Sequence, residues 1–298
     1  LRERPAPAWG NDHGAAALFH AGELHLKRGE REAAREAWLR IWSEHPRAPQ
    51  AEDAKQRADA LGGKPTLAQA VRRAIGFVDA HQNREGTDQI AALLPQLKLP
   101  DPLACEARFA LGRGYRKMRE HSRAIPILEE VVERCTDPAL RARALYVLGQ
   151  STSIVARPKA YGVYETLATE FADHSFADDA LFFLAELHDR DGDGAAARAT
   201  LQRLVESHPE GDYRAEALFR LFWIDRKAGA LRRGLQWLRV LERDYADAPD
   251  ATALERSLYW QGRTLVALER PIEAAATWEK LVRDHPARGG SVQGAGQR

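Results

Sequence analysis

The residues of this sequence best suited to chemistry are three carboxylates at alternate positions, Asp189, Asp191 and Asp193, followed by Gly194. This spacing imitates the start of a calcium-binding loop, which requires a bidentate Glu at its twelfth position. The twelfth position here is Thr200, which carries no carboxylate. Asp and Gly also suit turns. We therefore interpret the segment as a turn between two helices and predict no metal site there.

Three histidines, His45, His208 and His285, each precede a proline. They recur at one position of a repeat, so they belong to different units and cannot converge on one metal ion. The helix dipole favours a His near a helix C-terminus, and we interpret all three as structural.

The sequence contains no motif of a serine hydrolase, a zinc peptidase, a paired CxxC site or a phosphate-binding loop. Its many carboxylates are explained as parts of polar helix faces, and no sequence pattern identifies one of them as a general acid in a pocket. We therefore predict no catalytic, cofactor-binding or metal-binding residue, and we disfavour an enzyme made of this segment alone.

Tryptophans offer the other candidate contacts. Trp38, Trp237 and Trp278 hold the bulky position on the second helices of their units, with Trp42 and Trp260 nearby. Aromatic residues at such positions are far more often interface core than ligand platform. A sugar-stacking role would need an aromatic residue on a concave face, and the sequence does not show which residues face inward.

Two cysteines, Cys105 and Cys135, lie thirty residues apart within one repeat. Cys105 opens the first helix of its expected hairpin and Cys135 closes the second, so an antiparallel pairing brings these ends together and makes a disulfide feasible. A bridge would indicate an oxidising compartment. The alternative, two unlinked and partly buried thiols, is the one that we favour from the sequence.

The elements that would position these residues recur regularly. Small or apolar anchors follow one another at intervals of 36 to 40 residues in five cases. The anchors are Gly22, Gly76, Gly112, Gly149, Ala185, Phe222 and Gly262. Four are followed by Ala twelve residues later and four by Pro twenty-four residues later, at Ala34, Ala124, Ala197 and Ala274 and at Pro46, Pro100, Pro209 and Pro286. The pattern resembles the tetratricopeptide repeat, in which a small residue lies where two helices cross and Pro ends the unit.

This spacing predicts an all-α chain of tetratricopeptide-like helical hairpins, about six in number, stacked into an α-solenoid or superhelix. No segment shows the period-two alternation of a strand. Each unit of such an array buries its apolar face against its neighbours, and solenoids usually bind other molecules rather than catalyse.

Three regions are expected along the chain. Residues 1–14 carry Pro, Gly and charge without periodicity and are expected to form a flexible leader. Residues 15–286 are expected to form the repeat domain, and the Gly-, Gln- and Ser-containing residues 287–298 a disordered tail. The strongest internal break, GGKPT at 62–66, is a candidate hinge.

Two local signals refine the helix boundaries. Thr66 can cap the helix that follows it, with Gln69 three residues later completing a capping box. Pro95 is expected to kink or end the second helix of its unit, because proline removes a helical hydrogen bond.

Composition restricts the classes of partner. With 44 Lys+Arg against 43 Asp+Glu and a net charge of +1, the chain lacks a sequence-independent attraction to nucleic acid, and we expect no such partner. No stretch approaches eighteen apolar residues, so we expect no transmembrane segment. Met118 is the only Met. The lack of an initiator Met favours a piece of a longer protein, so that a missing leader says nothing about export.

The stretch 176–286 resembles the superhelical domain of bacterial soluble lytic murein transglycosylases. The similar segments are FADDALFFLAEL, HPEGDYRAEALFRLFWIDRKAGAL, ERSLYWQGRTLVAL and AAATWEKLVRDHP. One helix of that family reads like AEALFRLFW, and a later one carries a Tyr-Trp-x-x-Arg element, here Tyr259, Trp260 and Arg263. The resemblance weakens towards the N-terminus, and envelope tetratricopeptide proteins of other kinds share much of it.

The resemblance implies a fold and a compartment. Full-length members of that family are periplasmic and cleave the glycan backbone of peptidoglycan without water, using one catalytic Glu in a C-terminal lysozyme-like domain. After Pro286 this chain runs into a Gly-rich tail where the family has a linker helix and then that domain, so no catalytic residue is carried over. The resemblance therefore implies a periplasmic scaffold for a peptidoglycan-acting enzyme.

Our leading hypothesis is a helical-repeat scaffold or binding module, the non-catalytic superhelical region of a lytic transglycosylase-like protein in peptidoglycan turnover. The alternative is a free-standing tetratricopeptide adaptor that mediates protein–protein interactions in the bacterial envelope. A third interpretation, a glycan hydrolase or lyase in its own right, needs a pocket acid that the sequence does not nominate. The expected partner is a protein or peptidoglycan glycan strands along a concave groove, and no cofactor is expected.

Overall fold

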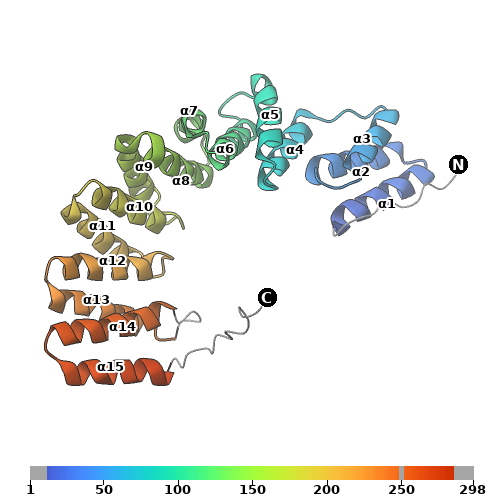
Figure 1. The fold of residues 1–298 in the computed structure, drawn as a ribbon. Coiled ribbons are helices and arrows are strands. Elements are labelled where there is room, and N and C mark those ends of the chain that lie inside the picture. The colour runs from blue at the N-terminus through green and yellow to red at the C-terminus, as the bar shows by residue number, and fades with distance from the viewer. Residues whose placement is uncertain (1–11, 248–251, 285–298) are drawn as a thin grey trace, which may run out of the picture. The chain divides into compact units, whose positions relative to one another are not determined.

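The computed structural model describes residues 12–247 and 252–284, which form α-helices, one short 3-10 helix and turns. The all-α expectation is confirmed for these residues (Figure 1). The chain divides into two compact units, unit 1 (Leu1–Val163) and unit 2 (Tyr164–Arg298), which are described separately. None of the helices in the described ranges combines the length and apolar character that crossing a membrane requires.

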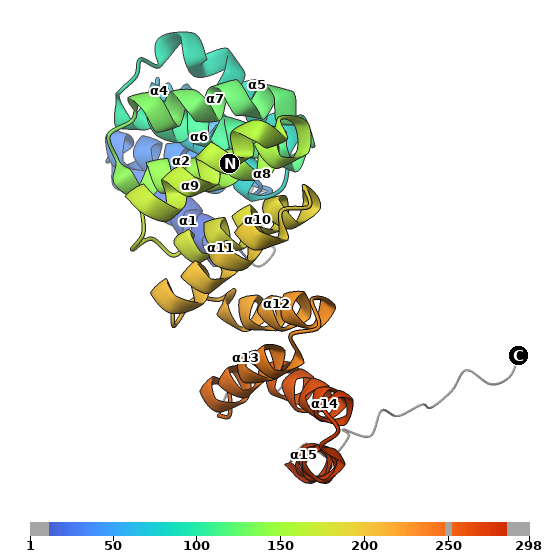
Figure 2. The same cartoon turned by 90° about the vertical axis from the view of Figure 1, so that its left-hand side faces the viewer.

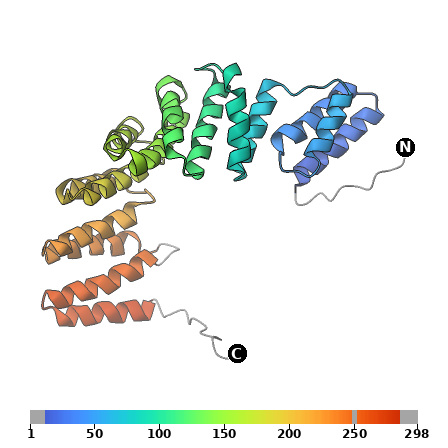
Figure 3. The ribbon, with the colours of Figure 1, turned by 45° about the horizontal axis from the view of Figure 1, so that its top comes forward.

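Unit 1 is built from three helix pairs together with two additional helices. Its helices are α1 (His13–Lys27), α2 (Arg31–Glu44), α3 (Ala51–Ala60), α4 (Leu67–Asp79), α5 (Asn83–Leu93), the 3-10 helix η1 (Leu94–Gln96), α6 (Pro102–Lys117), α7 (His121–Arg134) and α8 (Pro138–Val155). α1 packs on α2, α4 on α5 and α6 on α7, while α3 packs on α2 and α8 on α7. Figure 3 shows this succession in blue to green.

Unit 2 contains three further pairs. Its helices are α10 (Ala177–Arg190), α11 (Gly194–Ser207), α12 (Arg214–Lys227), α13 (Leu231–Asp244), α14 (Thr252–Ala267) and α15 (Pro271–Asp284), preceded by α9 (Arg157–Glu170), which begins in unit 1. α10 packs on α11, α12 on α13 and α14 on α15, and Figure 2 shows these helices following one another in yellow to red. Six packed hairpins therefore occupy the described ranges, as the repeat spacing predicts.

Local sequence explains where several helices begin and end. The backbone N–H of Gln69 donates to the Thr66 hydroxyl at 3.2 Å, and the backbone N–H of Thr66 donates to the Gln69 side-chain oxygen at 2.9 Å. These two bonds confirm the capping box of α4. Asp101 and Asp137 cap α6 and α8 directly before a Pro at the first helical position, where its missing amide costs no hydrogen bond. α5 ends and η1 begins immediately before Pro95, as expected.

The small anchors lie where paired helices cross. A Cβ atom added to Gly22 would overlap the indole of Trp38, and the same is true of Gly262 and Trp278. In both pairs the Trp comes sixteen residues after the glycine and folds back on it from the second helix. The alanines twelve residues after an anchor are also buried; they are Ala34, Ala124, Ala197 and Ala274. The helices therefore approach closely only because these positions carry little or no side chain.

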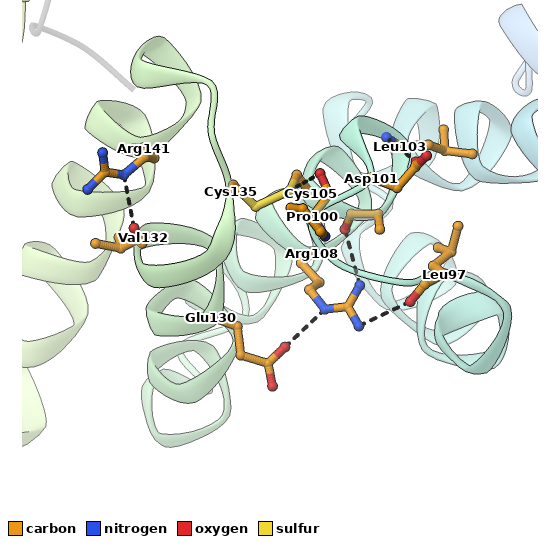
Figure 4. Close-up of a disulfide and its surroundings, with 11 residues drawn as sticks. Leu97, Pro100, Asp101, Leu103, Cys105, Arg108, Glu130, Val132, Cys135 and Arg141 are labelled. Atoms are coloured by element: carbon orange, nitrogen blue, oxygen red, sulfur yellow. Dashed lines mark hydrogen bonds and ion pairs between the residues drawn. A yellow bond between two sulfur atoms is a disulfide. The ribbon is translucent and has the colours of Figure 1, made fainter.

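Cys105 and Cys135 form a disulfide, with their Cα atoms 6.0 Å apart. The bridge joins the first turn of α6 to the residue that ends α7 (Figure 4). The preference for two unlinked thiols is therefore wrong. Residue spacing makes the bridge feasible without fixing how closely the two helix ends approach, whereas the packing of α6 on α7 places the two side chains within bonding reach.

Arg108 holds the same region together through hydrogen bonds. Its guanidinium donates to Glu130 on α7 at 2.9 Å and to the carbonyl of Leu97, just after η1, at 3.3 Å (Figure 4). The Arg108 side chain is largely buried, while that of Glu130 is exposed to water. α6, α7 and the segment that follows η1 are thus joined by a covalent bond and by one cation.

The expected ends and hinge of the domain are described only in part. α1 begins at His13, inside the expected leader 1–14, while residues 1–11 and the expected tail 287–298 lie outside the described residues. The segment 62–66 joins α3 to α4, and both helices pack on α2. Its role as a hinge stays a prediction.

Candidate binding groove

A cavity of about 250 Å³ lies between α10, α11 and α12 of unit 2. The first helices of two successive hairpins, α10 and α12, supply most of its lining, and α11 supplies the rest. Ala185 and Ala197, an anchor and the residue twelve positions after it, are both buried and both line the cavity. The small residues that let α10 and α11 pack closely therefore also leave the space that forms this hollow.

Helical spacing gathers the polar lining on two faces. Glu186 and Asp189 lie three residues apart on α10, and Arg220, Trp223 and Lys227 lie three or four residues apart on α12. Residues three and four apart share one helix face. The cavity therefore has an acidic wall on α10 and a basic, aromatic wall on α12.

Arg220 neutralises part of the acidic wall. Its guanidinium donates to Glu186 at 3.1 Å and to Glu216 at 3.2 Å. Asp189 and Lys227 are exposed, and neither forms an ion pair with another described residue. One carboxylate and one ammonium group of the lining therefore remain free to meet a ligand.

Trp223 also belongs to a second feature, formed by α12 and α14. Its ring centre lies 4.7 Å from that of Trp260 in an edge-to-face arrangement, and both residues are half-buried. The guanidinium of Arg226 lies 5.4 Å from the Trp260 ring centre and 5.9 Å from that of Trp223, and the guanidinium of Arg263 lies 5.7 Å from Trp260. We call Trp223, Arg226, Trp260 and Arg263 the aromatic–cationic patch, and we call the cavity together with this patch the groove of unit 2.

A buried carboxylate fixes α12 against its neighbours. Asp225 is fully buried and forms an ion pair with Arg198 of α11. It also accepts hydrogen bonds from Arg233 Nε and Trp237 Nε1 of α13, both at 2.8 Å. The helix that carries Trp223 and Arg226 is therefore held by three side chains that do not line the cavity.

The Asp-rich segment is the turn that the sequence predicts. α10 ends at Arg190, Gly192 adopts φ of +82°, and Asp193 caps α11 by accepting a hydrogen bond from the Ala196 amide at 2.9 Å. Glycine adopts positive φ without a steric cost. Of the three aspartates, only Asp189 lines the cavity.

The histidines that precede Pro end helices. His45 and His208 follow the last residues of α2 and α11, as predicted, and His285 lies outside the described residues. The His45 ring also forms a hydrogen bond of 2.9 Å with Asp12, the cap of α1. Burial acts to raise the pKa of Asp12, but hydrogen bonds from the Ala15 amide and from His45 outweigh it and hold that pKa below its usual range.

Tryptophans divide between core and groove. Trp38 and Trp278 pack on glycine anchors and Trp237 binds the buried Asp225, which confirms their interpretation as interface residues. Trp223 is the groove residue that sequence reasoning missed. Trp223 directly follows the anchor Phe222, and Glu186 directly follows the anchor Ala185. Both residues line the cavity, so the position after the anchor is the sequence signal that could have identified them.

Comparisons with known proteins agree with this architecture. Residues 16–48 and 179–211 match one tetratricopeptide repeat family model, and residues 107–142 match another. No curated protein matches the chain. The C-terminal part of a TPR repeat-containing protein from Cytophaga hutchinsonii is similar with a TM-score of 0.62 and 12% identity, over 94% of this chain and 100% of that one.

The apo form of RapI is also similar, with a TM-score of 0.58 and 11% identity over 90% of this chain and 76% of that one. Identities this low establish the fold alone. The packed helix pairs, the family matches and the similar solved structures together identify this chain as a tetratricopeptide-like helical repeat protein.

Proposed function

We propose that this chain is a non-catalytic scaffold that binds an extended segment of a protein partner in the groove of unit 2. The tetratricopeptide-like repeats support a role in protein–protein interaction. The main observation in support of this binding site is the cavity of about 250 Å³, which has small alanines in its lining and the half-buried Trp223 in one wall.

An apolar side chain of the partner would enter the cavity beside Ala185 and Ala197 and contact the Trp223 ring. Burying one Leu- or Phe-sized side chain contributes about 1.5–3 kcal/mol, which does not by itself offset the cost of association. The remaining contacts would come from α12 and α14, where the aromatic–cationic patch continues from Trp223.

A library of short linear peptides selected against the chain should yield ligands for this groove. We expect Trp223→Ala to weaken the selected peptides by at least about tenfold, because a half-buried Trp in a cavity wall has the character of a binding hot spot. Fluorescence anisotropy of labelled peptides measures the loss. Gln236→Ala, at an exposed position of α13, is the matched control and should leave the affinity unchanged.

Photo-crosslinking locates the same peptides directly. A benzophenone side chain at position 189, an exposed position in the cavity lining, should capture them while Trp223 stays in place, and one at position 236 should not. Capture at 236 alone, or selected peptides that bind Trp223→Ala as well as the unsubstituted chain, would show that the groove is not the binding site.

A finer candidate function is the superhelical scaffold of a lytic transglycosylase-like protein in the periplasm. The Cys105–Cys135 bridge supports an oxidising compartment, because disulfides persist there and are rare in reducing ones. The resemblance of residues 176–286 to that superhelical domain supports the link to peptidoglycan. A free-standing envelope adaptor satisfies the same two observations, so an assay with peptidoglycan must separate them.

In that assay, the purified chain is incubated with peptidoglycan sacculi and then sedimented. We expect no release of anhydro-muropeptides, since no catalytic acid is nominated, and we expect the finer candidate to sediment with the sacculi, alone or with a lytic transglycosylase. A chain that stays in the supernatant in both cases is an adaptor of another kind. Muropeptide release abolished by one Asp or Glu substitution within residues 16–286 would make the chain an enzyme.

A further inference from the structure

The aromatic–cationic patch holds two guanidinium groups that no carboxylate of the described residues neutralises. Within the described ranges, Arg226 and Arg263 form no ion pair, and Nη1 of Arg226 is buried without a hydrogen-bond partner. Arg263 donates only to the Tyr259 hydroxyl, at 3.0 Å. By contrast, the nearby Arg256 is paired with Glu216 at 2.9 Å.

The two acids of α12, Glu216 and Asp225, are engaged by other side chains. Asp225, next to Arg226 in sequence, is buried against Arg198, Arg233 and Trp237. Glu216 accepts from both Arg220 and Arg256. The positive charge beside Trp260 therefore remains available to a ligand. Lys227, exposed at the end of α12, adds a further positive charge to the lining of the cavity.

We propose that the patch binds an acidic side chain of the partner, so that the groove selects acidic segments. This inference rests on the proposed function of the groove. A carboxylate beside Trp260 would accept charge-assisted hydrogen bonds from Arg226 or Arg263, whose guanidinium groups lie 5.4 and 5.7 Å from the Trp260 ring centre. Such bonds are about twice as strong as those between neutral groups.

The position of the patch beside the cavity also predicts where the acidic residue lies in the partner's bound segment. Trp223 belongs both to the cavity and to the patch, so the residue over the patch lies close to the apolar residue in the cavity. The opposite wall carries Asp189, which is exposed and would repel a carboxylate. The acidic side chain should therefore lie on the α14 side of the apolar one.

Three synthetic peptides of equal length test the charge preference: Glu alternating with Phe, Gln alternating with Phe, and Lys alternating with Phe. In low salt, calorimetric titration should show the Glu peptide binding about tenfold more tightly than the Gln peptide, and the Lys peptide binding most weakly. Added salt should narrow the differences, because exposed charges are screened.

Substitutions then locate the preference. Arg226→Gln and Arg263→Gln should each weaken the Glu peptide by about three- to tenfold and leave the Gln peptide unchanged. Arg226→Lys keeps the charge and should keep most of the preference. Arg232→Gln, an exposed and unpaired arginine on α13, is the matched control and should change neither peptide. Circular dichroism verifies that each variant is folded.

The two proposals fail in different ways. Equal binding of the Glu and Gln peptides, or a Glu preference that survives both Gln substitutions, overturns the acidic-segment inference while the peptide-binding groove stands. Binding of none of the three peptides also overturns it. The groove itself is judged by the selected peptides and their dependence on Trp223.

Discussion

Replacing Asp225 by Ala should destabilise unit 2 by about 2–4 kcal/mol. The carboxylate is fully buried and accepts hydrogen bonds from Arg233 and Trp237, both at 2.8 Å, besides its ion pair with Arg198. Its removal leaves Arg198, whose side chain is 19% exposed, with an uncompensated charge. The Arg233 side chain is 51% exposed and can return to water, so the loss falls short of that for a fully buried cluster.

Urea unfolding followed by tryptophan fluorescence measures the loss, and amide hydrogen exchange locates it. Protection should fall in α11, α12 and α13 and remain in α6 and α7, because contacts in a repeat array are made between neighbours. Asp225→Asn keeps one acceptor oxygen, so it should lower the free energy of unfolding by less than Asp225→Ala. Glu206→Ala removes an exposed, unpaired carboxylate from α11 and should stay within about 0.5 kcal/mol of the unsubstituted chain. An Asp225→Ala variant as stable as this control would contradict the role given to the buried carboxylate.

Removing the Cys105–Cys135 bridge should destabilise unit 1 by about 3 kcal/mol. The bridge closes a loop of sequence separation 30, and in the chain-entropy model a cross-link of that length mainly restricts the unfolded chain. The double variant Cys105→Ala with Cys135→Ala avoids placing new polar groups at two buried positions. Urea unfolding should show the loss, together with faster amide exchange in α6 and α7.

Adding a reductant to both the unsubstituted chain and the double variant separates the effect of the bridge from that of the substitutions. It should lower the stability of the unsubstituted chain to that of the double variant and leave the double variant unchanged. Thiol titration of the unfolded, unreduced chain should find no free thiol. Two free thiols would refute the bridge and remove its support for an oxidising compartment, without affecting the fold.

The position of Asp225 also bears on binding. Trp223 and Arg226 lie on the same helix within three residues of this carboxylate, so the side chains that face a partner are carried by a helix fixed on its other side. A site on a braced helix loses little conformational freedom on binding. The Asp225→Ala variant should therefore also bind the selected peptides more weakly where it remains folded.

Repeat spacing determined the helix hairpins because the crossing of two paired helices requires a particular residue size at fixed positions. Positions 22 and 262 accept only glycine, because a Cβ atom there would overlap the indole of Trp38 or Trp278. Local hydrogen bonding likewise determined the capping box at Thr66, because both of its partners lie within one helical turn. These features depend on residues that are close in sequence or related by one repeat.

The disulfide and the groove depended on the tertiary structure. Cys105 and Cys135 have the same spacing whether or not the ends of α6 and α7 approach, and only the packed pair brings their Cα atoms to 6.0 Å. Trp223 and Trp237 are the same residue type on adjacent helices, yet one lines the cavity and the other binds Asp225. Helical periodicity assigns a residue to one face of its helix, but which neighbour covers that face depends on packing across hairpins. Repeat spacing thus specifies the hairpins, whereas packing between hairpins selects the side chains that remain available to a partner.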